Sequence, residues 1–267
     1  QFLFTGFSVK MRRVLGMIRN VRNCPAYLFH KWGIAKQHPF ILESHNGVSV
    51  EVPERMMHTV KEVFFTDDYK FDQIQSQVLN LSSEPVVIDV GANVGYLSAF
   101  TFTRFSKARV YSVEPIPNNL ELLRRNKERN DQFNWNIVEG VLSDKNEPLE
   151  IQFDEADSFS TSASMYGLDR SNHSIKVESQ TLEKLMQKEG LEHVHILKLD
   201  CEGAEYDILF CLSSELLNSI AFITMETHQI DEAKKNRDSL VSWLNQNGWK
   251  TDVIRSKVLA SNPNFKT

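Results

Sequence analysis

Cysteine is scarce in this chain of 267 residues, and the three that occur, Cys24, Cys201 and Cys211, lie far apart. This number and spacing exclude a disulfide framework and a zinc ribbon and favour a reducing compartment, so we expect a cytoplasmic protein. Long hydrophobic runs are also missing, because no apolar stretch approaches the roughly 20 residues that a membrane-spanning helix needs.

The chain also has no extreme content of hydrophobic or charged residues. Hydrophobic residues make up 41% of the chain and charged residues 24%, which are ordinary values for a globular protein. They exclude intrinsic disorder, collagen and a coiled coil. The length favours one large α/β domain or a core with a small appendage.

Charge is distributed unevenly, although the net charge of −5 is small. Residues 1–42 carry seven bases and no acid, so the remaining chain carries 23 bases against 35 acids. Such an arm can lie on a membrane surface, bind an acidic substrate or nucleic acid, or contact another subunit. Its simplest interpretation is a solvated basic face with an apolar side on the body. No RNA-binding module motif accompanies it, so the sequence gives no strong nucleic-acid signal.

Three parts of the chain differ in pattern. Residues 1–39 have apolar residues at rough helical spacing, which predicts a basic helical arm. Residues 40–84 begin with two strand patterns joined by His45-Asn46-Gly47, which predicts a β-hairpin, and continue with a helix from Pro53. Residues 85–262 alternate strand and helix patterns. This alternation predicts an α/β fold with a doubly wound, Rossmann-like parallel sheet and helices on both faces.

Strands of this sheet are expected at residues 86–90, 109–113, 135–142, 195–199, 221–226 and 251–255. Helices are expected from residue 96 and at residues 117–130, 181–189, 204–212 and 232–247. Short extra strands at 149–153 and 175–178 bracket a polar loop, residues 154–174. We interpret this loop as a substrate lid rather than a mobile excursion, because long loops in compact domains are usually functional.

The loop after the first strand reads Asp89-Val90-Gly91-Ala92-Asn93-Val94-Gly95. Glycine permits a tight turn there, and the amides that open the next helix face a polar or anionic ligand group. Asn93 stands where the dinucleotide fingerprint requires glycine, which disfavours a nicotinamide or flavin cofactor, and the phosphate-loop motif is absent. We predict cofactor binding by these loop residues: Asp89, Gly91, Ala92, Asn93 and Gly95.

Glu114 ends the second strand, where a carboxylate is placed to accept hydrogen bonds from both ribose hydroxyls of a nucleoside. Pro115 and Ile116 follow, and Ile116 is expected against the adenine face. The third strand leads to Val141 and Asp144, which we expect near the adenine amino edge. Asp144 is equally well explained as a turn residue.

Three acids, Asp200, Glu202 and Glu205, follow the fourth strand. Clustered carboxylates act as general bases or metal ligands, but Glu202 and Glu205 are equally suited to capping the next helix. His228 follows the fifth strand and is a candidate general base near neutral pH. A metal site formed with Glu226 would lack the tight spacing typical of metal ligands, and we predict none. The candidate catalytic residues are therefore Asp200, Glu202 and His228.

These motifs, in this order, resemble the FkbM family of class I S-adenosylmethionine-dependent methyltransferases. The resemblance rests on residues 87–95, on Val113-Glu114-Pro115 and on residues 196–205, and it covers residues 40–262. It implies S-adenosyl-L-methionine as the cofactor, with Glu114 on the ribose and Asp200 beside the transferred methyl. The residues it places around the methionine part are Asp89, Gly91, Asn93 and Gly95.

The resemblance implies O-methylation of a hydroxyl on a small molecule, sugar or glycan. The protein then aligns an acceptor oxygen with the S–CH₃ bond, with His228 or Asp200 as the base or with alignment alone. Two alternatives remain open. One is a macromolecule methyltransferase that binds RNA or protein through the basic arm, and the other is a non-catalytic cofactor-binding module.

Overall fold

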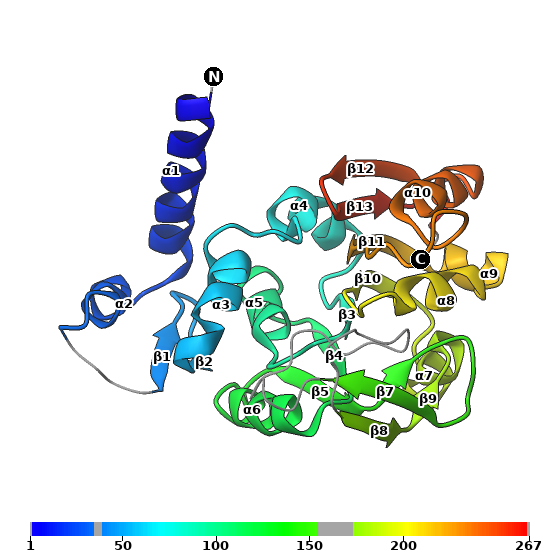
Figure 1. The fold of residues 1–267 in the computed structure, drawn as a ribbon, viewed down its shortest axis with the longest axis horizontal. Coiled ribbons are helices and arrows are strands. Elements are labelled where there is room, and N and C mark those ends of the chain that lie inside the picture. Colours follow the sequence, from blue (N-terminus) through cyan, green and yellow to red (C-terminus); the bar gives the residue numbers. More distant parts are fainter. Residues whose placement is uncertain (1, 35–38, 154–172, 266–267) are drawn as a thin grey trace.

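The computed structural model of the chain describes residues 2–34, 39–153 and 173–265. A seven-stranded sheet forms its centre, as Figure 1 shows, in the order β12-β13-β11-β10-β3-β4-β5. These strands are β12 (Lys250–Ile254), β13 (Lys257–Ser261), β11 (Ile220–Glu226), β10 (Val194–Leu199), β3 (Val86–Val90), β4 (Arg109–Glu114) and β5 (Asn134–Glu139). The substrate lid predicted at residues 154–174 lies almost entirely outside the described residues.

Helices cover both faces of this sheet, as predicted. The side chains of β3 alternate between two cores, because Val87 packs into one cluster while Val86 and Ile88 pack into the other. The first core is covered by α5 (Tyr96–Arg104) and α6 (Pro117–Glu128). The helices that cover the second are α7 (Leu182–Glu189), α8 (Ala204–Phe210), α9 (Ser214–Asn218) and α10 (Arg237–Gln246).

The strand order reverses between β3 and β10. From β3 the chain proceeds through β4 to β5 on one side, whereas β10 and β11 lie on the other. These five strands are parallel, so their carboxyl ends share one edge of the sheet. The point of reversal at this edge is where an open α/β sheet binds its ligands.

Two strands at one edge depart from the predicted parallel sheet. β13, which the sequence analysis missed, pairs antiparallel with β11, and β12 pairs antiparallel with β13. A short turn joins β12 to β13, and only antiparallel neighbours can be joined so directly.

Two predicted elements were too long. The third strand ends at Glu139, and β6 (Val141–Leu142) pairs instead with β9 (Ser179–Gln180). Gly140 separates them with φ +127°, and a Cβ there would lie 2.4 Å from the Glu178 carbonyl oxygen. The helix expected from residue 232 begins at Arg237, because Asn236 caps it by accepting a hydrogen bond from the Ser239 amide.

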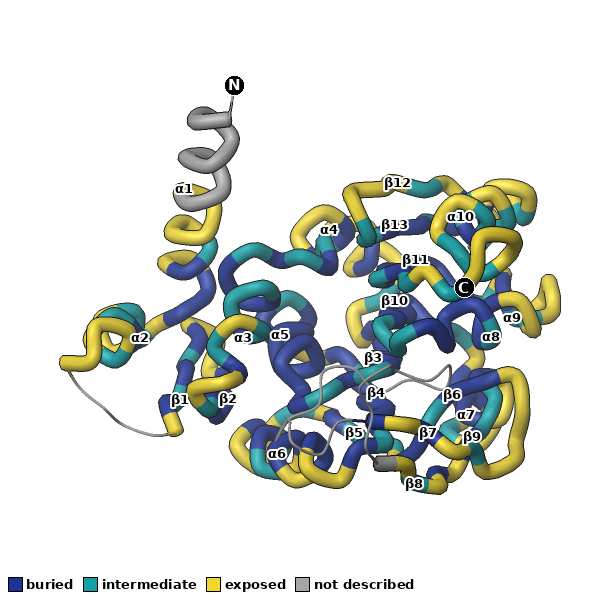
Figure 2. Tube along the Cα trace, in the orientation of Figure 1, coloured by how far each residue is buried: buried dark blue, intermediate teal, exposed yellow. Residues whose placement is uncertain are grey.

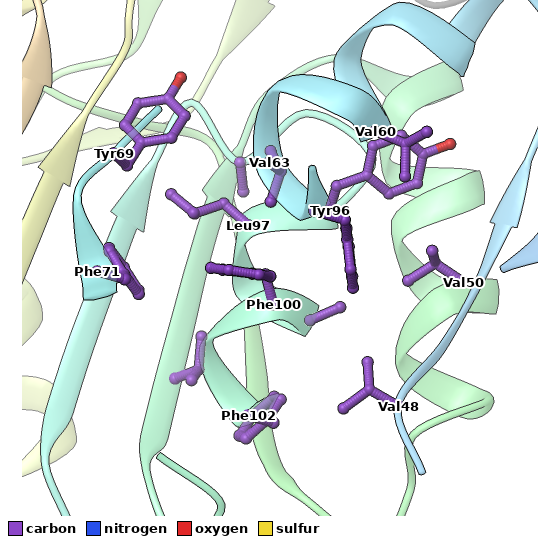
Figure 3. Packing of buried hydrophobic residues seen from close by; sticks show 14 of the residues in the cluster. Val48, Val50, Val60, Val63, Tyr69, Phe71, Tyr96, Leu97, Phe100 and Phe102 are labelled. Atoms are coloured by element: carbon purple, nitrogen blue, oxygen red, sulfur yellow. The ribbon is translucent and has the colours of Figure 1, made fainter. Parts of the chain in front are cut away.

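The hairpin and the helices that precede the sheet in the chain pack into the first core. β1 (Phe40–Glu43) pairs with β2 (Ser49–Val52), and η1 (Glu54–Met56), α3 (Met57–Phe64) and α4 (Phe71–Leu81) follow. Figure 3 shows Tyr96 and Phe100 of α5 packed among Val50 of β2 and Val60 and Val63 of α3. The prelude therefore packs on α5 and is continuous with the first core.

The arm forms two helices, α1 (Phe2–Asn20) and α2 (Cys24–Lys31), at one end of the molecule (Figure 1). Met17 and Val21 pack into the first core, and the Asn20 side chain donates to the Phe64 carbonyl. Figure 2 shows the described part of α1 largely exposed beyond this point. None of the helices in the described part of the chain is long and apolar enough to cross a bilayer.

Candidate active site

Two cavities adjoin at the point of strand reversal. Cavity 1 opens beside the ends of β3, β4 and β10, and cavity 2 opens towards α3, β11 and β13. Both are lined by Gly91, Asn93, Asp200 and Glu202, so these four residues stand at their junction. A group held in cavity 1 can thus face a group held in cavity 2.

Cavity 1 brings together most of the residues predicted to bind a cofactor. Its lining includes Gly91, Asn93, Glu114, Pro115, Ile116, Val141, Asp200 and Glu202. Ala92 lies in the lining of cavity 2 instead. Asp89, Gly95 and Asp144 line neither cavity, and each has a different position.

Glu114 is buried at the inner end of cavity 1. Its carboxylate accepts hydrogen bonds from the Ile116 amide at 3.0 Å, the Asn119 side chain at 3.1 Å and the Asn93 amide at 2.8 Å. Burial raises the pKa of Glu114 above its ordinary value, and these hydrogen bonds oppose the rise. A carboxylate offers about four acceptor positions, so about one is left for a hydroxyl of a ligand rather than the two that a ribose diol would use.

An apolar hairpin covers the outer side of cavity 1. β7 (Leu149–Phe153) pairs antiparallel with β8 (His173–Val177), and Ile151 and Phe153 pack with Ile116. The two extra strands predicted from the sequence thus form this hairpin. Ile116 and Ile151 give the cavity the apolar wall that a flat aromatic ring requires.

Gly91 allows the ends of β3 and β10 to meet. It has φ +70°, and a Cβ on it would lie 1.9 Å from the carbonyl oxygen of Asp200. The next loop residue with positive φ, Asn93 at 51°, uses its Oδ1 to accept from the Val94 amide. The loop glycine is therefore needed for the close approach of a neighbouring strand.

Gly95 serves packing. It begins α5 with φ +83°, and a Cβ there would lie 2.4 Å from Leu123 and 2.7 Å from Trp135. Asp144 is exposed beyond β6, in agreement with its interpretation as a turn residue. The structure thus separates these two residues from the cavities.

Asp89 lies buried beneath the loop. It forms an ion pair of 3.0 Å with Lys198, its register partner on β10, and accepts a hydrogen bond from Ser98. Lys198 also donates to the carbonyls of Val90 and Gly91. Burial lowers the pKa of Lys198, but the charges of Asp89 and Asp200 outweigh it and raise this pKa. The Asp89–Lys198 pair therefore stabilises the conformation of the loop from its buried side.

Tyr69 connects the prelude to the junction of the cavities. It is buried, and its hydroxyl donates to Asp200 at 2.5 Å. Burial raises the pKa of Asp200, but the charge of Lys198 and the hydrogen bond from Tyr69 outweigh it, so this pKa lies below its ordinary value. Asp200 is consequently ionised at neutral pH.

His228 faces the acids across cavity 2. Its Nδ1 lies 3.2 Å from Glu205, and its Nε2 lies 3.5 Å from Glu202 and 4.0 Å from Asp200. Burial lowers the pKa of His228, but the hydrogen bond and charge of Glu205 and the charges of the other two acids outweigh it and raise the pKa to about 9. His228 is therefore protonated at neutral pH, which differs from the base predicted near neutral pH.

The two acids whose roles the sequence left open are used differently. Glu205 is fully buried and accepts from the amides of Gly203 and His228, so it fixes the end of β11 to the start of α8. Glu202 lines both cavities with φ 51°. Burial raises the pKa of Glu202, and the charge of His228 opposes this rise.

Residues of cavity 2 that escaped the sequence analysis include Glu62, Tyr69, Lys198 and Lys257. Lys257 of β13 forms an ion pair with Glu226 and lies over the Tyr69 ring at 4.3 Å. A signal existed for Lys198, because a lone lysine within the apolar run of β10 requires a buried partner. Tyr69 and Lys257 reach the cavity from segments outside the parallel strands and carried no signal of their own.

Among the described residues, no group of three or more histidines, cysteines and acids is arranged to hold a metal ion.

Comparison with known proteins identifies the class that this fold and its two cavities define. The chain has the fold of a methyltransferase: the METTL16 methyltransferase domain superimposes with a TM-score of 0.50 at 14% identity, over 83% of this chain and 75% of that chain. The model of the methyltransferase FkbM domain matches residues 89–251, and the chain belongs to this family.

Relatives with similar sequences include methyltransferase sdnD of Sordaria araneosa, 23% identical over 62% of this chain and 73% of that protein. The 2-O-methyltransferase NoeI of Sinorhizobium fredii is 25% identical over 58% of this chain and 68% of its own length. The hexuronic acid methyltransferase AglP of Haloferax volcanii is 25% identical, over 64% and 69% respectively. The predicted family is thereby confirmed.

Proposed function

We propose that this methyltransferase uses S-adenosyl-L-methionine to methylate a hydroxyl of a small molecule or sugar. The observation that carries the proposal is the pair of cavities meeting at Gly91, Asn93, Asp200 and Glu202. The names of two relatives, a 2-O-methyltransferase and a hexuronic acid methyltransferase, support an acceptor of this class.

The residues of cavity 1 fit the cofactor. Glu114 has an acceptor position left for one ribose hydroxyl, and Ile116 and Ile151 offer apolar surface to the adenine ring. The ionised Asp200 at the junction favours the positive charge of the sulfonium.

When bound, the sulfonium supplies an activated methyl group. The chain's own residues then hold an acceptor hydroxyl in line and accept its proton. Glu202 is the base we assign, because its raised pKa makes it a better proton acceptor than Asp200. His228 is protonated and cannot take this proton, so we assign it to holding Glu202 and Asp200 in place.

Cavity 2 suits a polyhydroxylated acceptor. It presents the carboxylates of Glu62, Glu202 and Glu226, which accept hydrogen bonds from hydroxyls, and the ammonium group of Lys257, which donates them. Carboxylates beside an ammonium group are well matched to the hydroxyls of a sugar, which both donate and accept hydrogen bonds.

The test is transfer of a radiolabelled methyl group from S-adenosylmethionine to a panel of monosaccharides, uronic acids and small phenols. We expect a methyl ether product and a kcat for Glu202→Gln about 10²- to 10⁴-fold below wild type. The acid limb of the kcat profile should report a pKa above the ordinary glutamate value of 4.5, because a base must be deprotonated to act.

Asp144→Asn is the matched control, since this acid is exposed outside both cavities. The control should retain full activity, and Glu202→Gln should still bind S-adenosylhomocysteine. Binding of cofactor without any methylated product would favour the non-catalytic module. Product on RNA or protein alone would favour the macromolecule methyltransferase, and either result would overturn the proposal.

A further inference from the structure

The arm carries most of the exposed large apolar side chains of the described structure. Seven of the twelve such residues lie in the short segment that includes α1 and α2, and Figure 2 shows most of its described part exposed. They are Met11, Val14, Leu15, Ile18, Phe29, Trp32 and Ile34. The other five, Leu79, Leu81, Phe210, Val253 and Ile254, are scattered over the body.

Four of these side chains form a stripe on α1. Met11, Val14, Leu15 and Ile18 recur at the three- and four-residue spacing of one helix face. The opposite face is the one that packs, because Met17 is buried and a Cβ on Gly16 would lie 1.9 Å from the Phe65 carbonyl oxygen. The stripe therefore lies on the exposed side of α1, with exposed fractions of 45–60%, and Met11 and Leu15 at its edge also line a groove beside residues 65–73.

The arm has seven bases and no acid of its own, although Arg19 and Arg22 pair with Asp72 and Glu43 of the body. The Arg12 guanidinium, beside the stripe, donates to the Thr66 carbonyl, which leaves its charge uncompensated by that contact. Arg13 and Lys31 both lie near Lys61: burial lowers the pKa of Lys61, and the charges of Lys31 and Arg13 lower it further. Such a cluster is relieved by an anionic partner.

The uneven distribution of charge along the chain indicates which kind of partner the arm binds. Residues 1–42 carry seven bases and no acid, while the rest has 35 acids and 23 bases, so an anionic surface attracts the arm and repels the body. Two copies of this basic arm would repel each other. A second copy's acidic body offers only the scattered exposed apolar residues named above.

We propose that α1 and α2 form a membrane-docking arm that lies on an anionic lipid surface. The stripe enters the boundary between headgroups and acyl chains, the bases contact lipid phosphates, and Trp32 lies at the interface. The acidic body, with both cavities, is held on the water side. This proposal does not depend on which acceptor is methylated.

The test is flotation of the whole chain with phosphatidylcholine vesicles and with vesicles that also contain phosphatidylglycerol. Wild type should float with the anionic vesicles and be released by salt. Ile18→Glu should lower the partition coefficient about tenfold or more. Ile254→Glu, an exposed isoleucine of the body, is the matched control and should bind as wild type.

Charge is tested separately with Lys31→Gln, an exposed base at the end of α2. This replacement should lower the partition coefficient about fivefold. Lys188→Gln, an exposed base on α7, should change nothing.

Three results would overturn the proposal. They are failure of folded wild type to float, equal loss in Ile254→Glu, and a dimer in sedimentation that Ile18→Glu dissolves in the absence of vesicles. Binding of S-adenosylhomocysteine, measured on the same samples, reports on the methyltransferase site independently.

Discussion

At the scale of single residues, the candidate active site is distinguished by side chains that stay charged although they are buried. Lys198 is buried yet charged, because Asp89 compensates it directly below the loop. His228 is cationic between three carboxylates. Sequence patterns can place such residues at strand ends, but they cannot give protonation states, since these depend on partners distant along the chain.

The raised pKa of His228 predicts a pH-dependent contribution to stability. Its folded pKa of about 9 lies above the ordinary value of 6.5, so the stabilisation is complete below pH 6.5 and is lost as pH rises through 9. We expect the difference in unfolding free energy between wild type and His228→Gln to shrink by about 3 kcal/mol over this interval. Urea unfolding at a series of pH values measures it.

Wild type and His228→Gln share all other titrating groups, so the difference reports on His228 together with Glu202 and Asp200, whose pKa values its charge lowers. A difference that stays constant with pH would show that His228 is not stabilised as a cation by Glu205 and its neighbours.

At the scale of elements, the sequence predicted the parallel strands well because each is a short apolar run ended by polar residues. β3, β10 and β11 agree with prediction to within one residue at each end. β13 was missed, because its own residue pattern does not predict a strand. It is a strand because it pairs antiparallel with β11. The third strand is shorter than predicted for a local reason, because Gly140 turns the chain towards Glu178.

The junction of β3 and β10 makes a prediction for Gly91→Ala. A Cβ there would lie 1.9 Å from the Asp200 carbonyl oxygen, so the two strand ends must separate. We expect a loss of more than about 2 kcal/mol in unfolding free energy and disruption of both cavities. Gly190→Ala is the control, because this glycine has a similar φ of +62° but nothing within 4 Å of an added Cβ.

Equilibrium urea unfolding of the two variants separates backbone conformation from crowding. Gly190→Ala should cost only about 1 kcal/mol. Equal losses in both variants would mean that the contact between Gly91 and Asp200 is not what the loop glycine provides.

At the scale of the whole molecule, the two cavities differ in how well the sequence predicts the residues that line them. Cavity 1 was largely foreseen, because its residues follow successive parallel strands of one sheet. Cavity 2 was not, because Tyr69 comes from the prelude and Lys257 from the antiparallel edge. Under the proposed function, the sequence motifs therefore indicate the cofactor better than the acceptor, because cavity 2 is formed by long-range packing.

The most direct test is calorimetric titration of the whole chain with S-adenosylhomocysteine, with NAD as the negative control. Glu114→Gln removes the carboxylate at the inner end of cavity 1. Glu139→Gln removes its register partner on β5, an exposed acid outside cavity 1. The melting temperature of each protein without ligand confirms that it is folded.

We expect wild type and Glu139→Gln to bind S-adenosylhomocysteine alike, NAD to remain silent, and Glu114→Gln to bind more weakly by about 1.5–3 kcal/mol. Folded wild-type protein that fails to bind, or a Glu114→Gln variant that binds as tightly as wild type, would contradict the placement of the cofactor in cavity 1.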